Sequence, residues 1–292
     1  TTQGNGRAAA GNANYGWWSG AQQTLDPGYM KTWVYRLDYA NDTAAPTPKG
    51  GILSQGYGHS ASGNSDYGWH VGGSDGVPSR FTYVSRIDYS NDTATASSRA
   101  NTTVVHNNGG STGNSSYGYF NAGQNGPTIT ARIDYSNDTT TPVIRNIMPS
   151  SHNSRAGTSP LINGFPTMTP GPKVTDKGAD GYTTSSSGPA MGYVLGGAMP
   201  YSFSDVLRID YSNDTATAST KGPLTAGTSY QAAVSNKDHG YSMGGKTPSN
   251  GKSSKVDRVD YANDTATAAV KGPLSAGVYR SYAGVGNKDE DT

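Results

Sequence analysis

The chain of 292 residues contains no cysteine. Disulfide bonds, thiolate metal sites and thiol nucleophiles are therefore excluded together. Because large secreted domains of eukaryotes often use disulfides, this absence favours a bacterial or viral product. Charged residues are also scarce, at 15% of the sequence, against roughly 25% in typical globular domains.

The few charges are balanced and scattered. Lys and Arg number 22 and Asp and Glu number 21, which gives a net charge of +1. Because nucleic-acid binding needs a concentrated basic surface, we expect no nucleic-acid partner. No stretch approaches about 18 consecutive apolar residues, and the N-terminus lacks a basic segment followed by an apolar one. We therefore expect no membrane insertion and no export leader in this sequence.

Signatures of catalysis are missing as well. No Gly-x-Ser-x-Gly elbow, phosphate-binding loop or His-Glu-x-x-His sequence occurs. The histidines are spread over the chain with no pair at metal-ligand spacing, and we expect them to fill strand or loop positions. They are His59, His70, His106, His152 and His239. We expect no enzyme, no cofactor and no metal site.

The sequence contains five copies of one eight-residue motif, Arg-(Leu/Ile/Val)-Asp-Tyr-(Ala/Ser)-Asn-Asp-Thr, which we call the phrase. The copies begin at residues 36, 86, 132, 208 and 258, so successive starts are 50, 46, 76 and 50 residues apart. Self-similarity at about 40–50 residues is typical of the blades of a β-propeller. We expect one repeat domain over residues 1–292. The copies are Arg36–Thr43, Arg86–Thr93, Arg132–Thr139, Arg208–Thr215 and Arg258–Thr265.

Each unit contains four short segments rich in β-branched and aromatic residues. In the fifth unit they are Tyr230–Asn236, Gly240–Gly245, Lys255–Ala262 and Thr265–Lys271. Asn-Asp after the third segment tolerates left-handed backbone and bonds to its own turn, so it predicts a tight connection into the fourth strand. Each unit is therefore predicted to be a four-stranded antiparallel sheet, and the whole an all-β, five-bladed propeller.

These residues resemble a known repeat. A second strand ending in Gly-Gly, as at Gly72-Gly73, and an Asp-Tyr third strand followed by a turn are similar to the kelch repeat of β-propellers. More narrowly, the amino-acid sequence of Asp88–Ala96, together with that of Lys271–Ser275, resembles repeats in structural proteins of marine bacteriophages. The resemblance implies a component of a phage particle.

The two ends of the chain offer more first strands than five blades need. Tyr279–Asn287 matches the first strand at Tyr230–Asn236, and Arg7–Asn12 resembles one too. We expect the N- and C-terminal strands to close the ring. The spare end is left open: it is unused, pairs with a neighbouring subunit, or belongs to a longer array.

The loops from second to third strand vary most between units. In a four-stranded blade these loops share one face with the crossovers between blades. We expect the long insertion at about Asn146–Asp180, which causes the 76-residue spacing, to lie on this face as a partner-binding loop; a solvated spacer or a subunit contact is the alternative. The contact candidates are Tyr29, Phe165, Tyr201 and Phe203.

The repeated phrase admits two further roles for its polar residues. Five Asp-x-x-Asn-Asp clusters suggest calcium, but they lack the alternating ligands and bidentate Glu of a calcium loop, so we favour a turn. Arg86 and Asp88, and their counterparts two residues apart in each copy, predict an ion-pair ladder between blades. Asn-Asp-Thr is also a glycosylation acceptor, a minority reading that applies to Asn41, Asn91, Asn137, Asn213 and Asn263.

From these observations we expect a structural or adhesive module in a phage fibre, tail or capsid decoration, located on a virion or another extracellular surface. Its partners would be other virion or surface proteins and cell-surface glycans, and a homo-oligomer remains open. One alternative is a carbohydrate-active enzyme with paired carboxylates in the central channel. The other is a secreted glycan-binding lectin.

Overall fold

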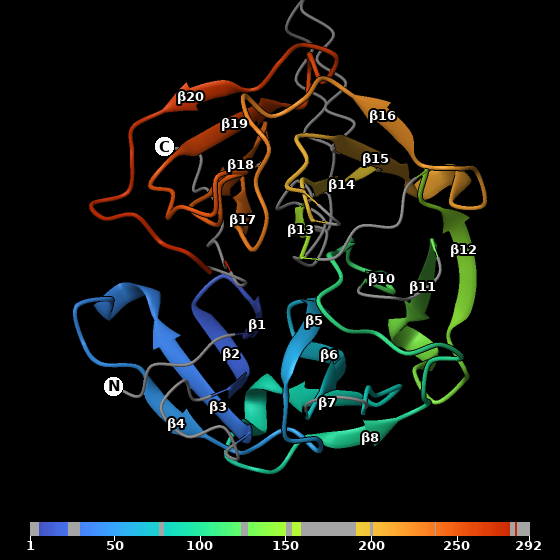
Figure 1. Ribbon diagram of the computed structural model, residues 1–292. Helices are drawn as coiled ribbons and strands as arrows, with labels where there is room; N and C mark the ends of the chain where they lie inside the picture. The colour runs from blue at the N-terminus through green and yellow to red at the C-terminus, as the bar shows by residue number, and fades with distance from the viewer. Residues whose placement is uncertain are drawn as a thin grey trace, which may run out of the picture.

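The computed structural model describes residues 6–22, 30–75, 79–123, 128–149, 154–158, 191–198, 201–236, 238–280 and 284. The described strands form five four-stranded antiparallel sheets around a common axis, which is a five-bladed β-propeller (Figure 1). Within each sheet the strands follow chain order from the axis outward. The fold predicted from the repeat is confirmed.

Each blade draws its four strands from one stretch of the chain. The first contains β1 (Ala8–Gly11), β2 (Tyr15–Gln22), β3 (Met30–Asp38) and β4 (Thr47–Lys49). The second contains β5 (Tyr57–Gly63), β6 (Tyr67–Ser74), β7 (Val84–Asp88) and β8 (Ser97–Arg99). The third contains β9 (Ser111–Gly113), β10 (Tyr117–Asn121), β11 (Ile129–Asp134) and β12 (Val143–Ile147). The fourth contains β13 (Ala156–Thr158), β14 (Met191–Leu195), β15 (Val206–Asp210) and β16 (Ser219–Lys221). The fifth contains β17 (Ala232–Ser235), β18 (His239–Met243), β19 (Val256–Asp260) and β20 (Ala269–Lys271).

The connections between strands lie on two faces of the ring. We call the side with the first-to-second and third-to-fourth connections, such as residues 12–14 and 89–96, the turn face. The opposite side, with the second-to-third loops and the crossovers between blades, such as residues 75–83 and 50–56, is the loop face. On the turn face, the Asn12 side-chain oxygen accepts hydrogen bonds from the N–H groups of residues 14 and 15, at 3.0 and 3.1 Å. Asn64, Asn114 and Asn236 close their hairpins in the same way.

The third-to-fourth connection begins earlier than the sequence predicts. Each third strand ends at the first Asp of the phrase, and in four blades the following Tyr-x-Asn forms one turn of 3-10 helix. In the second blade, Asp88 Oδ1 accepts the N–H of Ser90 at 2.9 Å and its hydroxyl at 2.7 Å, which caps the turn. The predicted turn is therefore confirmed, but it is longer than the Asn-Asp pair. The 3-10 turns are η1 (Tyr39–Asn41), η2 (Tyr89–Asn91), η3 (Tyr135–Asn137) and η5 (Tyr211–Asn213).

The hydrophobic core lies between neighbouring blades. Between the first and second blades, Trp17 and Val34 pack with Ile87 and Tyr89 in one buried cluster. The Trp17 and Tyr89 rings stack with centroids 3.9 Å apart. Equivalent buried clusters join the second blade to the third, the third to the fourth and the fourth to the fifth. The blades are thus held together by the faces they present to each other.

A buried carboxylate completes each of these four junctions. Asp92, at the turn of the second blade, accepts a hydrogen bond from the Trp17 indole N–H at 2.9 Å. It also pairs with Arg36 Nη1 and Lys49 Nζ of the first blade, both at 3.0 Å. Three donors from one blade therefore compensate the desolvation of a carboxylate on the next. The counterparts are Asp138 with Trp69, Arg86 and Arg99, Asp214 with Tyr119, Arg132 and Arg145, and Asp264 with Tyr193, Arg208 and Lys221.

The predicted ladder of ion pairs between blades exists, but its acidic partner differs from the prediction. Arg86 pairs with Asp138 of the next blade. Asp88, two residues along the same strand, instead caps its own turn. The phrase therefore uses its two aspartates differently: the first fixes the turn and the second holds the neighbouring blade.

The N-terminal candidate supplies the innermost strand of the first blade. Strand β1 (Ala8–Gly11) pairs with β2 from Ala8 opposite Ser19 to Gly11 opposite Gly16. The C-terminal candidate, Tyr279–Asn287, lies largely outside the described residues. Its described Gly284 packs against the carbonyl oxygen of Ala233 on β17.

The placement predicted for the long insertion is wrong. Residues 146–147 belong to β12, and Ala156–Thr158 forms β13, the innermost strand of the fourth blade. The insertion thus falls after β13, which ends on the turn face, and before β14; residues 159–190 between these strands lie outside the described residues. The signal of β13 is weak in the sequence because the strand is three small residues long.

Candidate functional site

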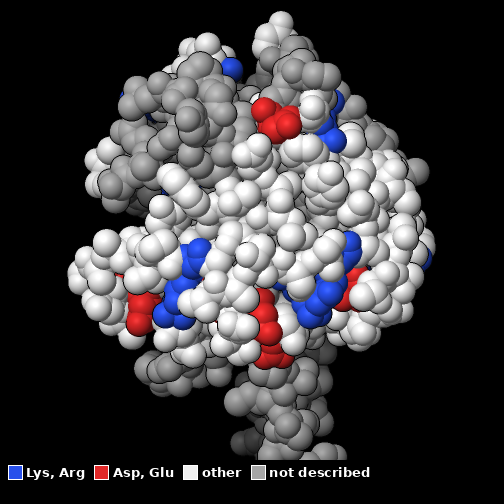
Figure 2. All heavy atoms as spheres, turned by 90° about the horizontal axis from the view of Figure 1, so that it is seen from below, with Lys and Arg blue, Asp and Glu red and all other residues white. Residues whose placement is uncertain are grey.

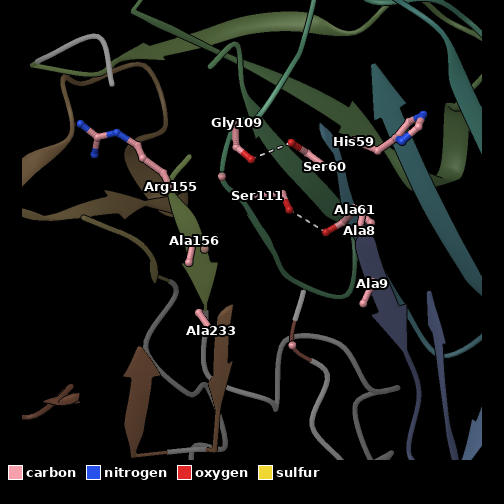
Figure 3. A pocket seen from close by; sticks show the side chains of 13 residues that line it. Ala8, Ala9, His59, Ser60, Ala61, Gly109, Ser111, Arg155, Ala156 and Ala233 are labelled. Atoms are coloured by element: carbon pink, nitrogen blue, oxygen red, sulfur yellow. Dashed lines mark hydrogen bonds between the residues drawn. The ribbon is translucent and has the colours of Figure 1, made fainter. Parts of the chain in front are cut away.

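A small cavity lies on the axis of the ring, where the innermost strands meet. Its volume is about 110 Å³, and its described walls are mostly alanine, serine and glycine (Figure 3). Hydroxyl groups bridge adjacent innermost strands: Ser60 donates to the Gly109 carbonyl at 2.9 Å, and Ser111 donates to the Ala61 carbonyl at 2.6 Å. The small side chains allow five strands to approach the axis closely.

The cavity is small compared with ligand pockets, which span roughly 300–1,000 Å³. Its described lining contains no Asp or Glu, and hence no pair of carboxylates. The guanidinium of Arg155 points away from the cavity in Figure 3 and pairs with Asp205 at 3.1 Å. Water or a small ion is the kind of occupant that the described walls could accommodate.

Three histidines are buried between the first three blades. Burial lowers the pKa of His59 to about 4 and that of His70 to about 3, with the His59 charge adding to the effect on His70. Burial also lowers the pKa of His106 to about 4, opposed by a hydrogen bond to the Asn121 carbonyl at 3.0 Å. His70 forms a 2.5 Å hydrogen bond with Ser19 of the first blade. These neutral rings fill strand and loop positions, as predicted for them; His152 lies outside the described residues, and His239 is half-buried on β18.

The described residues contain no cluster of three or more His, Asp or Glu that could hold a metal ion. Within the repeated phrase both aspartates already have partners at the four packed junctions, as caps or as ion-pair acceptors. On the side of the ring in Figure 2, positive and negative side chains lie next to one another between broad uncharged areas. That side therefore offers no surface of a single charge.

Large apolar side chains are exposed mainly on the loop face. Among the described residues, exposure reaches 73% for Tyr201, 46% for Tyr83 and 44% for Leu53, all in loop-face connections. Trp33, 37% exposed, lies at the loop-face end of β3. The other large apolar residues that are exposed in the described chain are aliphatic and lie on the outermost strands: Val143, Ile144 and Val270.

Leu53 and Tyr83 belong to one region. The N–H of Ile52 donates to the Thr32 carbonyl at 2.8 Å, and the N–H of Leu53 donates to the Ser85 hydroxyl at 3.3 Å. The crossover is thereby held between the third strands of the first two blades. The ring of Tyr83 stacks on that of Phe81 with centroids 5.3 Å apart. A rigid aromatic pair is thus displayed beside the crossover.

The structure places two of the four contact candidates predicted from sequence. Tyr201 is exposed at the β14–β15 loop, whereas Phe203 is half-buried and its backbone is fixed by hydrogen bonds to Gly197 and Thr228 at 2.8 and 2.9 Å. Tyr29 and Phe165 lie outside the described residues. Sequence reasoning missed Trp33, Leu53 and Tyr83, although each adjoins a variable loop or a crossover.

The five asparagines of the Asn-Asp-Thr sites share one environment. All are exposed at the end of their turns on the turn face: Asn41, Asn91, Asn137, Asn213 and Asn263. In three of them the side-chain oxygen also accepts a bond from the Thr two residues on, at 3.4 Å. Glycosylation at these sites stays a prediction, which a mass measurement would check.

The geometry defines a β-propeller whose fold is compatible with a non-enzymatic binding module. No protein-family model matches the sequence, and no curated protein matches it either. In the described part of the chain, no helix has the length and apolar character needed to span a membrane.

Proposed function

We propose that this protein is a non-enzymatic structural or adhesive module of a bacteriophage particle, and that it binds its partner through the loop face. The observation that carries the proposal is the placement of exposed aromatic residues. Among the described residues, Tyr83 and Tyr201 are exposed at loops of this face, while the turn face presents the repeated polar Asn-Asp-Thr turns. Aromatic side chains on a rigid scaffold are typical of recognition surfaces.

The assignment to a phage particle is supported by the resemblance of Asp88–Ala96 and Lys271–Ser275 to repeats in structural proteins of marine bacteriophages. The location proposed with it is a virion or another extracellular surface. The partners proposed are other virion or surface proteins and cell-surface glycans. Such partners suit a nearly neutral surface, because no strong electrostatic field is needed to attract them.

Location is tested by immunogold electron microscopy of particles from the source culture, with an antibody raised against this chain. Gold at a fixed place on the particle is the expected result. Particles free of label in a preparation where the antibody detects the free protein would overturn the assignment to the virion.

The binding surface is tested with Tyr83→Ala/Tyr201→Ala and with Val143→Ser/Val270→Ser as a matched control on the outermost strands. Both pairs remove exposed apolar groups, so both proteins should fold. On a panel of immobilised glycans and virion proteins, we expect the first pair to lose binding by about tenfold or more and the second to retain it. Equal losses would place the contact elsewhere.

The same panel separates the two alternatives. Saturable glycan binding without turnover would favour the secreted lectin, especially if no label is found on particles. Release of sugar products would favour the carbohydrate-active enzyme and contradict the non-enzymatic proposal.

A further inference from the structure

Among the described residues, the junction between the fifth and first blades lacks the packing seen at the other four. Asp42 of the first blade is exposed, whereas its counterparts Asp92, Asp138, Asp214 and Asp264 are buried. Within the described residues the Asp42 carboxylate has no ion pair.

The donors expected on the other side of this junction are present but unused. Tyr241, Arg258 and Lys271 of the fifth blade correspond to Tyr193, Arg208 and Lys221 of the fourth, which all meet Asp264. Among the described residues none of the three side chains reaches a carboxylate. Both halves of the network therefore exist, but they do not meet.

Three equivalent glycines show the same difference between the packed junctions and the fifth-to-first junction. A methyl group on Gly50 would collide with the Ala94 carbonyl of the next blade, and one on Gly222 would collide with the Ala266 carbonyl. The N–H groups of Gly50 and Gly222 each donate to the carbonyl of the next blade's buried Asp at 2.8 Å. Gly272 of the fifth blade instead faces open space among the described residues.

The apolar side chains at this junction are only partly covered. On the first blade, Trp18, Tyr35 and Leu37 are half-buried, and Trp33 on the same side of β3 is exposed. The residues equivalent to Leu37 are fully buried in every other blade, namely Ile87, Ile133, Ile209 and Val259. On the fifth blade, Tyr241, Met243 and Leu274 are half-buried, although their counterparts in the first four blades are buried. In Figure 1 the fifth blade (β17–β20) and the first (β1–β4) stand apart on the left of the ring.

One described residue near the C-terminus, Gly284, occupies a sixth position around the axis. Gly284 packs against the Ala233 carbonyl of β17, just as Gly157 of β13 packs against the Ser111 carbonyl of β9. In both cases the glycine occupies the place of the next innermost strand around the ring. Gly284 also lines the axial cavity together with Ala8 and Ala9 of β1.

We propose that the seam between the fifth and first blades is a docking site for a sixth repeat sheet supplied by a partner polypeptide. The fifth blade offers Tyr241, Arg258 and Lys271, which require a buried Asp on the occupant. The first blade offers the Asp42 carboxylate beside Leu37, which requires aromatic and cationic donors on the occupant's other side. One sheet of this repeat meets both requirements, because every unit carries the donors on one side and the aspartate on the other. The inference is independent of the loop-face function.

A first experiment asks whether the seam is open in solution. Because the native chain has no cysteine, spin labels can be placed singly and cleanly. Labels at Asp42→Cys and Arg258→Cys should lie farther apart than labels at Asp264→Cys and Arg208→Cys, which flank a packed junction. Equal short distances would show that the first and fifth blades close directly on each other, which would overturn the proposal.

A second experiment supplies the occupant. The probe is a peptide copying residues 239–280, which spans the second to fourth strands of the fifth unit, added to the full chain. We expect saturable 1:1 binding by titration calorimetry, weakened about tenfold by Arg258→Ala and by Asp42→Ala, as when a charge-assisted contact is removed. Arg99→Ala, at the packed junction between the second and third blades, serves as the control that leaves this affinity unchanged.

A third experiment fuses a second copy of residues 239–280 to the chain, directly after Asp289. This junction keeps the natural sequence, because Asn287-Lys288-Asp289 repeats Asn236-Lys237-Asp238, which precedes residue 239. The added strands should be protected from hydrogen exchange, and Arg258→Ala should now lower the melting temperature by about as much as Arg208→Ala is expected to. An attached unit that exchanges freely, together with a peptide that does not bind, would refute the docking site even though the five-bladed ring remains folded.

Discussion

The four packed junctions and the fifth-to-first seam are built from the same repeated residues, yet only the packed junctions bury them. Arg208 and Arg258 occupy equivalent positions, but within the described part of the chain only Arg208 meets a carboxylate of the following blade. The Arg and the second Asp of the repeat therefore form their ion pairs between units, whereas the first Asp caps the turn of its own unit. Stability in such a chain depends on each blade having a neighbour.

The largest contrast is expected for the two equivalent aspartates Asp264 and Asp42. Asp264→Ala leaves Arg208, Lys221 and the Tyr193 hydroxyl without their acceptor, and should cost about 3 kcal/mol of unfolding free energy. Asp42→Ala removes an exposed side chain and should change stability by less than about 0.5 kcal/mol. Urea unfolding followed by fluorescence measures both, and similar losses would contradict the contrast between seam and junction.

Lowering the pH should destabilise the packed junctions that contain buried histidines more than the other packed junctions. His59, His70 and His106 have folded-state pKa values lowered to about 4, 3 and 4, so below about pH 6.5 the unfolded chain binds more protons than the folded one. Their contribution is complete above pH 6.5 and is lost as pH falls towards 4. Between pH 6 and 5 each histidine should lower the unfolding free energy by about 1 kcal/mol.

The location of this acid effect is a further check. The three rings lie at the first-to-second and second-to-third junctions, so hydrogen exchange should increase there before it increases in the fourth and fifth blades. The triple variant His59→Gln/His70→Gln/His106→Gln should flatten the pH dependence in this range. An unchanged slope would assign it to other groups.

A pair of glycines gives a smaller effect with no charge involved. Gly222→Ala drives a methyl group into the Ala266 carbonyl of the next blade and should cost about 2 kcal/mol. Gly272→Ala meets no described atom and should be neutral or stabilising by a few tenths of a kcal/mol. Thermal unfolding of the two variants compares packed and open positions directly, and destabilisation by Gly272→Ala would indicate a covered seam.

The smallest effect is expected for replacing residues 159–190 with a four-residue turn that copies Gly113–Ser116, the residues between the equivalent strand positions of the third blade. Thr158 and Tyr193 remain paired in the fourth sheet, so shortening the connection should change stability by less than about 1 kcal/mol. Circular dichroism and thermal unfolding would detect a larger loss, which would show that the segment supports the blade.

The architecture was accessible from sequence because the signal is repeated. Five copies of the phrase predict five blades, and alternation in the third strand predicts the burial of Ile87. The partner of Arg86 was not accessible, because Asp88 and Asp92 are both nearby in sequence and only the placement of the next blade decides between them. The position of β13 was hidden for a different reason: Ala156-Gly157-Thr158 has too little side chain to show a strand pattern.

The candidate surface was only partly predictable. Tyr201 stands in a variable loop and is exposed, as a loop residue should be. Phe203 is two residues away, but backbone hydrogen bonds to Gly197 and Thr228 hold it half-buried. Tyr83 precedes β7 in an apolar stretch, so its sequence pattern indicates burial although nearly half of it is exposed. Exposure at strand ends depends on the crossover from the previous blade, which no local pattern reports.

The column of small residues facing the axis limits how many sheets can share it. Ala9, Ala61, Ser111, Gly157 and Ala233 hold equivalent positions in the five innermost strands, and none is bulkier than serine. Any larger side chain there would push the strands outward and enlarge the circumference. Side-chain size at this one position therefore helps to set the diameter of the ring. Replacing the residue at this position in all five units together should give rings of another size.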